Sequence, residues 1–167
     1  MLKQFHYNIE EMLRDKAPLF LLLENIQDPG NLGTMLRTGE GAGVSGIIMS
    51  RDTVDLYNPK VIRSTMGSIY RVPFYYADDF AAAVHQVQQA GVSVYAAHLR
   101  GKNSYACQDY TKGTAFLIGN EGNGLREETA ELADCYIRIP MEGKVESLNA
   151  AVASSILMYE AHRQRAI

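Results

Sequence analysis

The stretch FLIGNEGNGL (116–125) is an apolar run that ends in a turn with three glycines and one carboxylate. Such a turn after a buried strand often lets a ligand approach the backbone closely. The spacing of Gly119, Gly122 and Gly124 matches neither a P-loop nor a dinucleotide-binding fingerprint, and the turn contains no lysine. Because Glu121 adds a negative charge, the turn suits a neutral or cationic ligand. The alternative is a structural turn in which Glu121 only sits near the next helix.

A second stretch, IPMEGKVESLNAAVAS (139–154), follows the same kind of strand. A proline ends the strand, a polar loop follows, and Ser147 and Asn149 stand at the head of a helical run. Backbone groups of such a loop can receive a flat, hydrogen-bonding ring such as adenine, with the helix N-terminus facing the reacting centre. The alternative is a serine that only caps the helix.

A third stretch, QDPGNLGTMLRTGEGAG (27–43), places Asn31 and Arg37 on the first long helix. Asn31 is the expected N-cap of that helix, and Gly43 the expected stop. An arginine among Gly, Leu and Met residues favours a partner for its charge. The alternative is a surface arginine whose stem covers apolar neighbours.

The elements that must position these residues alternate along the whole chain. Apolar runs predict strands at 19–24, 46–49, 71–76, 92–98, 114–119 and 135–140. Caps and helical spacing predict helices at 31–43, 58–68, 78–91, 126–133 and 147–163, and residues 101–105 are expected to form a loop. This alternation predicts an α/β fold with a mainly parallel sheet covered by helices on both faces. We expect one domain at 18–167, preceded by a linker or leader at 1–17.

In such sheets, ligands bind outside the carboxyl ends of the strands. The loops 27–31, 98–104, 119–124 and 140–149 all leave these ends and all carry polar residues. We therefore expect them to converge on one pocket.

Composition narrows the class of protein. The 167 residues are 47% hydrophobic and 21% charged, with a net charge of −3, so no global basic field marks a nucleic-acid binder. Two cysteines without a C-x-x-C pair indicate a reduced compartment. The N-terminus has no signal-peptide pattern, and the apolar run at 18–23 is too short to span a bilayer. We expect a cytoplasmic protein with no membrane and no metal site.

Taken together, the three stretches resemble the three signature motifs of the SpoU/TrmH family of SPOUT RNA methyltransferases. The N-x-G-x-x-x-R motif is present as Asn31, Gly33 and Arg37, and the G-x-E-x-x-G turn as Gly119, Glu121 and Gly124. The third motif, I-P-M followed by E-S-L-N, is present at 139–141 and 146–149. The resemblance covers residues 18–165.

This resemblance implies a fold whose C-terminal part forms a deep trefoil knot, a homodimer, and S-adenosyl-L-methionine as cofactor. It implies methyl transfer to an RNA ribose 2′-oxygen, with rRNA favoured over tRNA as substrate. The implied catalytic residues are Arg37, Asn31, Glu121, Ser147 and Asn149. The implied cofactor-binding residues are Ala97, His98, Leu99, Gly101, Ile118, Gly119, Asn120, Gly122, Ile139, Met141, Leu148 and Asn149.

Several questions stay open at this stage. Arg37 either stabilises the developing oxyanion and the adjacent phosphate, or acts as a base. Local basic positions that could contact RNA are Arg51, Lys60, Arg63, Arg71, Arg100 and Lys102. The alternatives to an rRNA enzyme are a tRNA 2′-O-methyltransferase, a non-catalytic RNA-binding or ribosome-assembly module, and a generic nucleotide-binding protein. The missing phosphate motifs disfavour the last of these.

Overall fold

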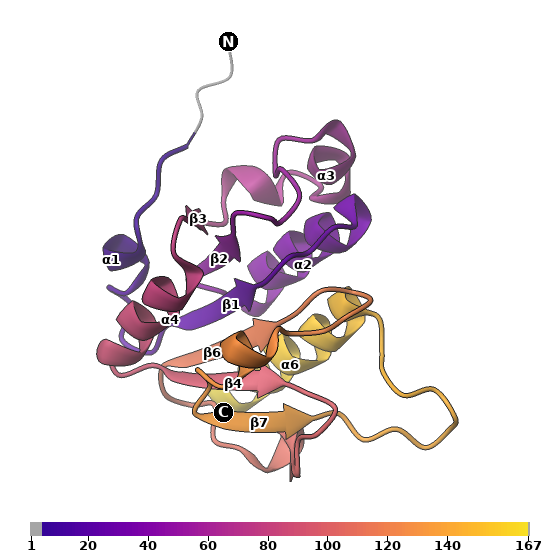
Figure 1. Cartoon of the computed structure of the whole chain (residues 1–167). Helices are drawn as coiled ribbons and strands as arrows, with labels where there is room; N and C mark the ends of the chain where they lie inside the picture. The colour runs from indigo at the N-terminus through magenta and orange to yellow at the C-terminus, as the bar shows by residue number, and fades with distance from the viewer. Residues whose placement is uncertain (1–4, 167) are drawn as a thin grey trace.

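The computed structural model describes residues 5–166 (Figure 1). The strands in this range are β1 (Leu19–Leu23), β2 (Gly46–Ser50), β3 (Phe74–Ala77), β4 (Ser93–Ala97), β5 (Asn103–Ser104), β6 (Thr114–Ile118) and β7 (Cys135–Arg138). The α-helices are α1 (Ile9–Met12), α2 (Pro29–Ala42), α3 (Pro59–Ser64), α4 (Phe80–Gln89), α5 (Glu127–Ala130) and α6 (Ala150–Arg165). Two short 3-10 helices are η1 (Ser68–Tyr70) and η2 (Tyr105–Cys107).

The strands form one sheet in the order β3-β2-β1-β6-β4-β7-β5. Every neighbouring pair is parallel. The α/β class with a parallel sheet between helices is therefore confirmed.

The central strand β1 is buried along its whole length. Leu19, Leu21 and Leu23 belong to the core on the side of α2 and α6. Phe20 and Leu22 belong to the core on the side of α1 and α4. Each such side chain contributes about 1.5–3 kcal/mol by leaving water, so both faces favour apolar residues. This explains why the run shows no alternation.

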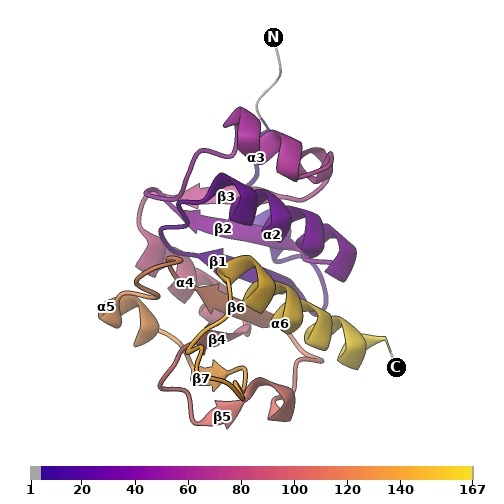
Figure 2. The same cartoon turned by 90° about the vertical axis from the view of Figure 1, so that its right-hand side faces the viewer.

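Helices α2 and α6 lie side by side on one face of the sheet (Figure 2). Helix α3 packs so closely on α2 that a Cβ at Gly33 would lie 2.1 Å from Cβ of Ser64. Glu40 of α2 also accepts hydrogen bonds from Ser68 and Arg71, which fixes η1 to the same helix. α2, α3 and η1 therefore form one rigid block.

The carboxyl ends of all the strands meet at one edge of the sheet. In the central pair, Leu23 of β1 stands opposite Ile118 of β6. The connections that follow β1, β4, β6 and β7 leave from this edge, and the one after β7 extends away from the body of the molecule (Figure 1). The predicted convergence is confirmed for three of the four loops, which line one cavity, whereas the loop 27–31 lines no part of it and is joined to it through Glu121.

The predicted start of α2 is wrong by one turn. The helix begins at Pro29, and Asp28 is its N-cap, with Oδ1 accepting from the backbone N–H of Asn31 at 2.7 Å. Proline suits the first helical position because it has no N–H to satisfy there, so the residue before it becomes the cap. The end of α2 is as predicted, with Gly43 in the left-handed conformation at φ 79°.

Other predicted segments differ in extent. The helices predicted over 126–133 and 147–163 span Glu127–Ala130 and Ala150–Arg165. The helix predicted over 58–68 ends at Ser64, because Met66 and Gly67 take positive φ values of 50° and 89°. The strand predicted over 71–76 spans Phe74–Ala77. The segment 101–105, predicted as a loop, contains the two-residue strand β5 at the edge of the sheet.

The region predicted as a linker or leader contains α1. Ile9 and Met12 of this helix are 5% and 4% exposed and pack in the core beside α4. No helix within residues 5–166 combines the length and hydropathy needed to cross a lipid bilayer.

Candidate functional site

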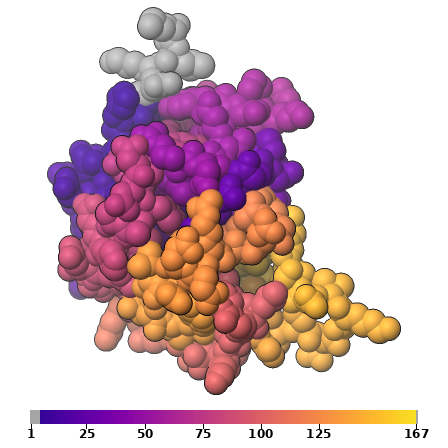
Figure 3. Space-filling view, in the orientation of Figure 1, coloured from indigo at the N-terminus to yellow at the C-terminus, as the bar shows by residue number. Residues whose placement is uncertain are grey.

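A cavity of about 630 Å³ opens at the carboxyl edge of the sheet, between the turn after β6 and the loop before α6 (Figure 3). Its size is typical of a site for a small molecule. The stretches that line it are 97–100, 118–125, 137–139 and 146–148, together with Glu127, Met141, Ala150, Ala153 and Leu157.

The turn after β6 is closed by its own backbone. The N–H groups of Asn120 and Gly124 each donate to the other residue's carbonyl, at 3.1 and 2.9 Å. A Cβ at Gly119 would lie 2.2 Å from backbone atoms of Gly124 and Leu125, so only glycine fits there. Gly124 itself has a φ of 68°. Both glycines are thus required by the turn, and the backbone stays accessible on the cavity side.

Glu121 ties this turn to the loop between β1 and α2. Its carboxylate accepts from the backbone N–H of Asp28 at 2.9 Å and from that of Gln27 at 3.1 and 3.2 Å. Burial would raise the pKa of Glu121, but the backbone N–H groups of Asp28, Glu121 and Gln27 and the side chain of Asn31 outweigh it and lower the pKa. The charged carboxylate is therefore the form that holds the turn.

A chain of side-chain hydrogen bonds continues from Glu121 to the third stretch. Asn31 donates from Nδ2 to Glu121 at 3.4 Å, and its Oδ1 accepts from Nδ2 of Asn149 at 3.1 Å. Asn149 in turn caps α6, with Oδ1 accepting from the N–H groups of Ala151 and Val152 at 2.8 and 3.2 Å. One residue from each of the three sequence stretches thus meets at the mouth of the cavity.

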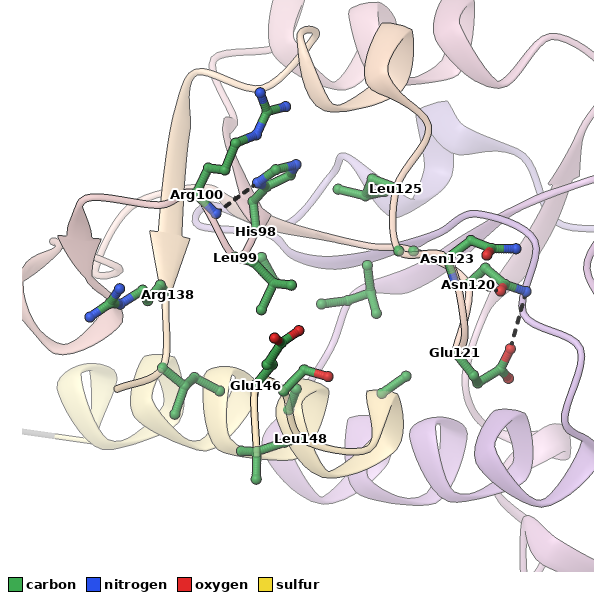
Figure 4. Close-up of a pocket in the computed structure, with 18 of the residues that line it drawn as sticks. His98, Leu99, Arg100, Asn120, Glu121, Asn123, Leu125, Arg138, Glu146 and Leu148 are labelled. Atoms are coloured by element: carbon green, nitrogen blue, oxygen red, sulfur yellow. Dashed lines mark hydrogen bonds between the residues drawn. The ribbon is translucent and has the colours of Figure 1, made fainter. Parts of the chain in front are cut away.

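The charged side chains around the cavity favour a ligand without phosphate groups. Arg100 is paired with Glu127, with Nη2 at 2.8 Å from each carboxylate oxygen. Both Arg100 and Arg138 point away from the centre of the cavity, whereas Glu146 points into it (Figure 4). The lining therefore offers the Glu146 carboxylate and backbone groups inward.

His98 forms part of the wall opposite α6. Its ring stacks on Tyr136 with centroids 4.8 Å apart, and its Nδ1 accepts from the backbone N–H of Arg100 at 3.1 Å (Figure 4). Burial lowers the pKa of His98, and the charge of Arg100 lowers it further. The imidazole is therefore neutral at pH 7, as its role as an acceptor at Nδ1 requires.

The model of the SpoU rRNA Methylase family matches residues 18–159, which span every segment of the cavity. The chain belongs to this family.

Three relatives illustrate the range of the SpoU family. A 23S rRNA (guanosine(2553)-2′-O)-methyltransferase, RlmP of Bacillus subtilis, is 37% identical over 83% of this chain and 56% of its own length. The SpoU methyltransferase AviRb from Streptomyces viridochromogenes, solved in complex with the cofactor AdoMet, gives a TM-score of 0.88 at 31% identity, over 95% of this chain and 62% of its own. A solved structure concerned with the 2-OH methylation of C/U34 on tRNA gives a TM-score of 0.81 at 32% identity, over 90% of this chain and 97% of its own. The chain thus spans about half the length of RlmP.

The SpoU motif residues predicted as catalytic occupy different places. Glu121 and Ser147 line the cavity, and Asn31 and Asn149 bridge at its mouth. Arg37 is exposed on α2 and is not part of the lining. The structure therefore brings four of these five residues together within one protomer.

The residues predicted to bind the cofactor mostly line the cavity. Those that do are Ala97, His98, Leu99, Ile118, Gly119, Asn120, Gly122, Ile139, Met141 and Leu148. Gly101 lies behind the wall, where a Cβ would stand 2.8 Å from the backbone of Ile137, and Asn149 contributes through its cap.

Sequence reasoning missed five apolar lining residues, Leu125, Ile137, Ala150, Ala153 and Leu157. Leu125 closes the stretch FLIGNEGNGL, so its place beside the turn was a usable signal. Ala153 and Leu157 are four residues apart on α6 and share a face, but this spacing is equally typical of core packing. Among residues 5–166, no three His, Cys, Asp or Glu side chains gather closely enough to hold a metal ion.

Proposed function

We propose that this chain is an S-adenosyl-L-methionine-dependent RNA methyltransferase that methylates a ribose 2′-oxygen, with rRNA as the favoured substrate. The observation that carries the proposal is the hydrogen-bonded chain from Glu121 through Asn31 to Asn149 at the mouth of the cavity. It unites all three motifs of the SpoU family at one small-molecule site. The 2′-O-methyltransferase activity of RlmP and the AdoMet complex of AviRb support the same reading.

The cavity residues fit this cofactor. S-adenosylmethionine carries an adenine, a ribose and a positive sulfur but no phosphate, and the cavity presents the Glu146 carboxylate inward while Arg100 and Arg138 point out (Figure 4). The glycine turn lines the cavity, so its backbone groups can serve the adenosyl group as donors and acceptors. Backbone groups near Leu99, Gly119, Ile139 and Leu148 would hold the cofactor.

When bound, S-adenosylmethionine supplies a methyl group activated by its positive sulfur. The protein residues then have to orient the two reactants and stabilise charge. Glu121 and Asn31 fix the turn to the start of α2, and Asn149 fixes the start of α6 to the same point. Ser147 lies in the loop between them and shapes the wall on the side of α6. In this proposal Arg37 stabilises the negative charge that develops on the ribose oxygen, since a guanidinium normally stays charged.

We also propose a homodimer in which Arg37 of one protomer completes the site of the other. The exposed apolar side chains on the outward face of α2 and α6 support this dimer. Val152 and Tyr159 lie two turns apart on α6 and are 48% and 47% exposed, and the Tyr159 hydroxyl lies close to Gly41 of α2. Arg37 is exposed on the same α2. Joining two copies through these helices would cover the apolar side chains.

The C-terminal trefoil knot belongs to the proposal as well. β7 lies beyond β4 from β6, and the chain then returns through 139–149 to α6 beside α2. This return path, together with the TM-score of 0.88 to AviRb, supports a knotted C-terminal part.

For the RNA substrate, the surface of α3 is the best candidate. Three of the six predicted basic positions are paired with carboxylates: Arg51 with Asp78, Arg71 with Glu40 and Arg100 with Glu127. Within the described part of the chain, Lys60 and Arg63 on α3 have no such partner. α3 belongs to the rigid block that carries Arg37, and residues 56–76 contain no acidic residue. This surface therefore suits an RNA backbone.

The test is methyl transfer from labelled cofactor to rRNA and to tRNA, prepared unmodified from cells that lack the protein. Label in rRNA that survives alkaline hydrolysis as a 2′-O-methylated dinucleotide supports the proposal. Label confined to tRNA supports the second candidate, which the near-complete coverage of the tRNA-related chain favours. A chain that binds both the cofactor and RNA but methylates neither RNA would be a non-catalytic RNA-binding module.

A further inference from the structure

The far end of the cofactor turn is held by a second cluster, which the family motifs do not include. Arg126 follows the turn directly and meets two carboxylates, Glu24 at the end of β1 and Asp52 after β2. The backbone N–H of Arg126 donates to Glu24 Oε2 at 2.9 Å, and its Nη1 donates to Oε1 at 3.3 Å. Thr129 of α5 also donates to Oε1, at 2.5 Å. Arg126 thus joins the turn to two neighbouring strands.

Glu24 is the most buried carboxylate in the described part of the chain, at 2% exposed. A buried carboxylate is costly unless it is paired and hydrogen-bonded, and replacing such a pair by apolar groups is often neutral or stabilising. Stability alone therefore gives little reason for a buried glutamate at this position. Its three donors all come from the segment that follows the cofactor turn, which points to a positioning role.

Asp52 connects the cluster to the β1–α2 loop, which also binds Glu121 at the other end of the turn. Its Oδ1 accepts from Ser50 Oγ at 2.5 Å, and Ser50 Oγ accepts from the backbone N–H of Asn25 at 2.8 Å. The carbonyl of Asp52 accepts from Gln27 Nε2 at 2.5 Å. Gln27 is the residue whose backbone N–H binds Glu121. The two ends of the turn are therefore fixed to the same β1–α2 loop, one by Glu121 and the other by Arg126.

We propose that Arg126, Glu24 and Asp52 form a positioning cluster that sets the cofactor affinity of the turn at 119–125. The proposal rests on the proposed function, because it takes the adenosyl cofactor as the ligand of that turn. Arg126 is a positioning residue. Its side chain reaches Glu24 and Asp52, and it acts on the cofactor only through the turn.

The test compares wild type with Arg126→Met, Glu24→Gln and the double variant. Arg163→Met is the matched control, because Arg163 pairs with Glu160, a mostly buried carboxylate at the other end of α6. The Kd for S-adenosylhomocysteine is measured by calorimetry at a temperature where every variant is folded. We expect a rise of about tenfold or more for Arg126→Met and Glu24→Gln, a similar rise for the double variant, and less than twofold for Arg163→Met. In turnover, KM for the cofactor should rise while kcat at saturating cofactor stays within threefold.

Amide hydrogen exchange without any ligand gives an independent measurement. Exchange in the segment 119–126 should accelerate in Arg126→Met and Glu24→Gln, with β6 unchanged. If wild type does not bind S-adenosylhomocysteine, the proposed function fails, whereas the exchange result still tests the cluster. If wild type binds but Arg126→Met binds equally well, the cluster does not set the cofactor affinity. If the turn of Arg126→Met exchanges at the wild-type rate, the cluster does not hold the turn. Either result refutes the proposal.

Discussion

Replacing Glu121 by glutamine tests how the charged anchor holds the turn. The substitution keeps one oxygen, which can still accept from Asp28, but it places an NH2 group opposite the N–H of Gln27 and Nδ2 of Asn120. At least one charge-assisted hydrogen bond is lost. Such bonds contribute about 1.5–3 kcal/mol, and the exposed position of Glu121 favours the lower end of the range. We expect Glu121→Gln to lower the free energy of unfolding by about 1.5 kcal/mol at pH 7.

The pH dependence of this difference tests the reasoning. Because the pKa of Glu121 is lowered in the folded state, its stabilisation is complete above the ordinary value of 4.5 and is lost as pH falls through the folded-state pKa. Urea denaturation of both proteins from pH 7 to pH 3 should therefore show a difference that is constant above about pH 5 and shrinks below it. A difference that stays constant down to pH 3 would refute the charged anchor, as would equal stability at pH 7.

Four further variants test other parts of the site and its surroundings. Gly119→Ala forces a Cβ to 2.2 Å from the backbone of the turn and should cost about 2 kcal/mol or more in unfolding free energy, measured by urea denaturation. Arg37→Ala should lower kcat for methyl transfer by roughly 100-fold or more while the Kd for S-adenosylhomocysteine stays within twofold; retained activity would remove Arg37 from the mechanism. Tyr159→Asp should convert a dimer into a monomer in light scattering, and an unchanged mass would contradict the proposed interface. The double variant Lys60→Gln, Arg63→Gln should reduce the slope of log affinity for RNA against log salt by about 2, and an unchanged slope would exclude α3 as the RNA surface.

The sheet could be predicted because strands buried on both faces appear in the sequence as continuous apolar runs. The runs 19–23 and 115–118 are apolar throughout, and both form central strands whose two faces pack against helices. The edge strand β3 was misplaced by three residues at its start. Two of its four residues are only partly buried, so its pattern is weaker.

The first residues of the helices were harder to predict, because more than one nearby residue can serve as the N-cap. Asp28 and Asn31 are both good N-caps, and Pro29 decides between them by fixing the first turn. At α6, Ser147 and Asn149 compete in the same way, and the structure selects Asn149 because its side chain also reaches Asn31. Such a choice depends on a tertiary contact that no local pattern contains.

Most of the site could be predicted from its sequence motifs, but the positioning cluster of Arg126, Glu24 and Asp52 could not. The resemblance pointed to the stretches of Asn31, Glu121 and Asn149, which the structure joins by hydrogen bonds. Glu24 gave no usable signal, because a glutamate at the end of an apolar strand is equally typical of the point where a strand reaches water. Its burial arises only when Arg126 folds over it, 102 residues later in the chain.

The pairing of β1 with β6 sets the order in which the molecule can be assembled. Leu19 stands opposite Thr114, so the middle of the sheet joins segments that are far apart in the chain. During synthesis, β1, β2 and β3 can pair while one side of β1 still exposes unpaired N–H and C=O groups. That side stays open to wrong partners until the later strand emerges from the ribosome, and closing so long a loop is slow. The nascent chain therefore acquires its ligand site only after β6 and the loop before α6 have been synthesised.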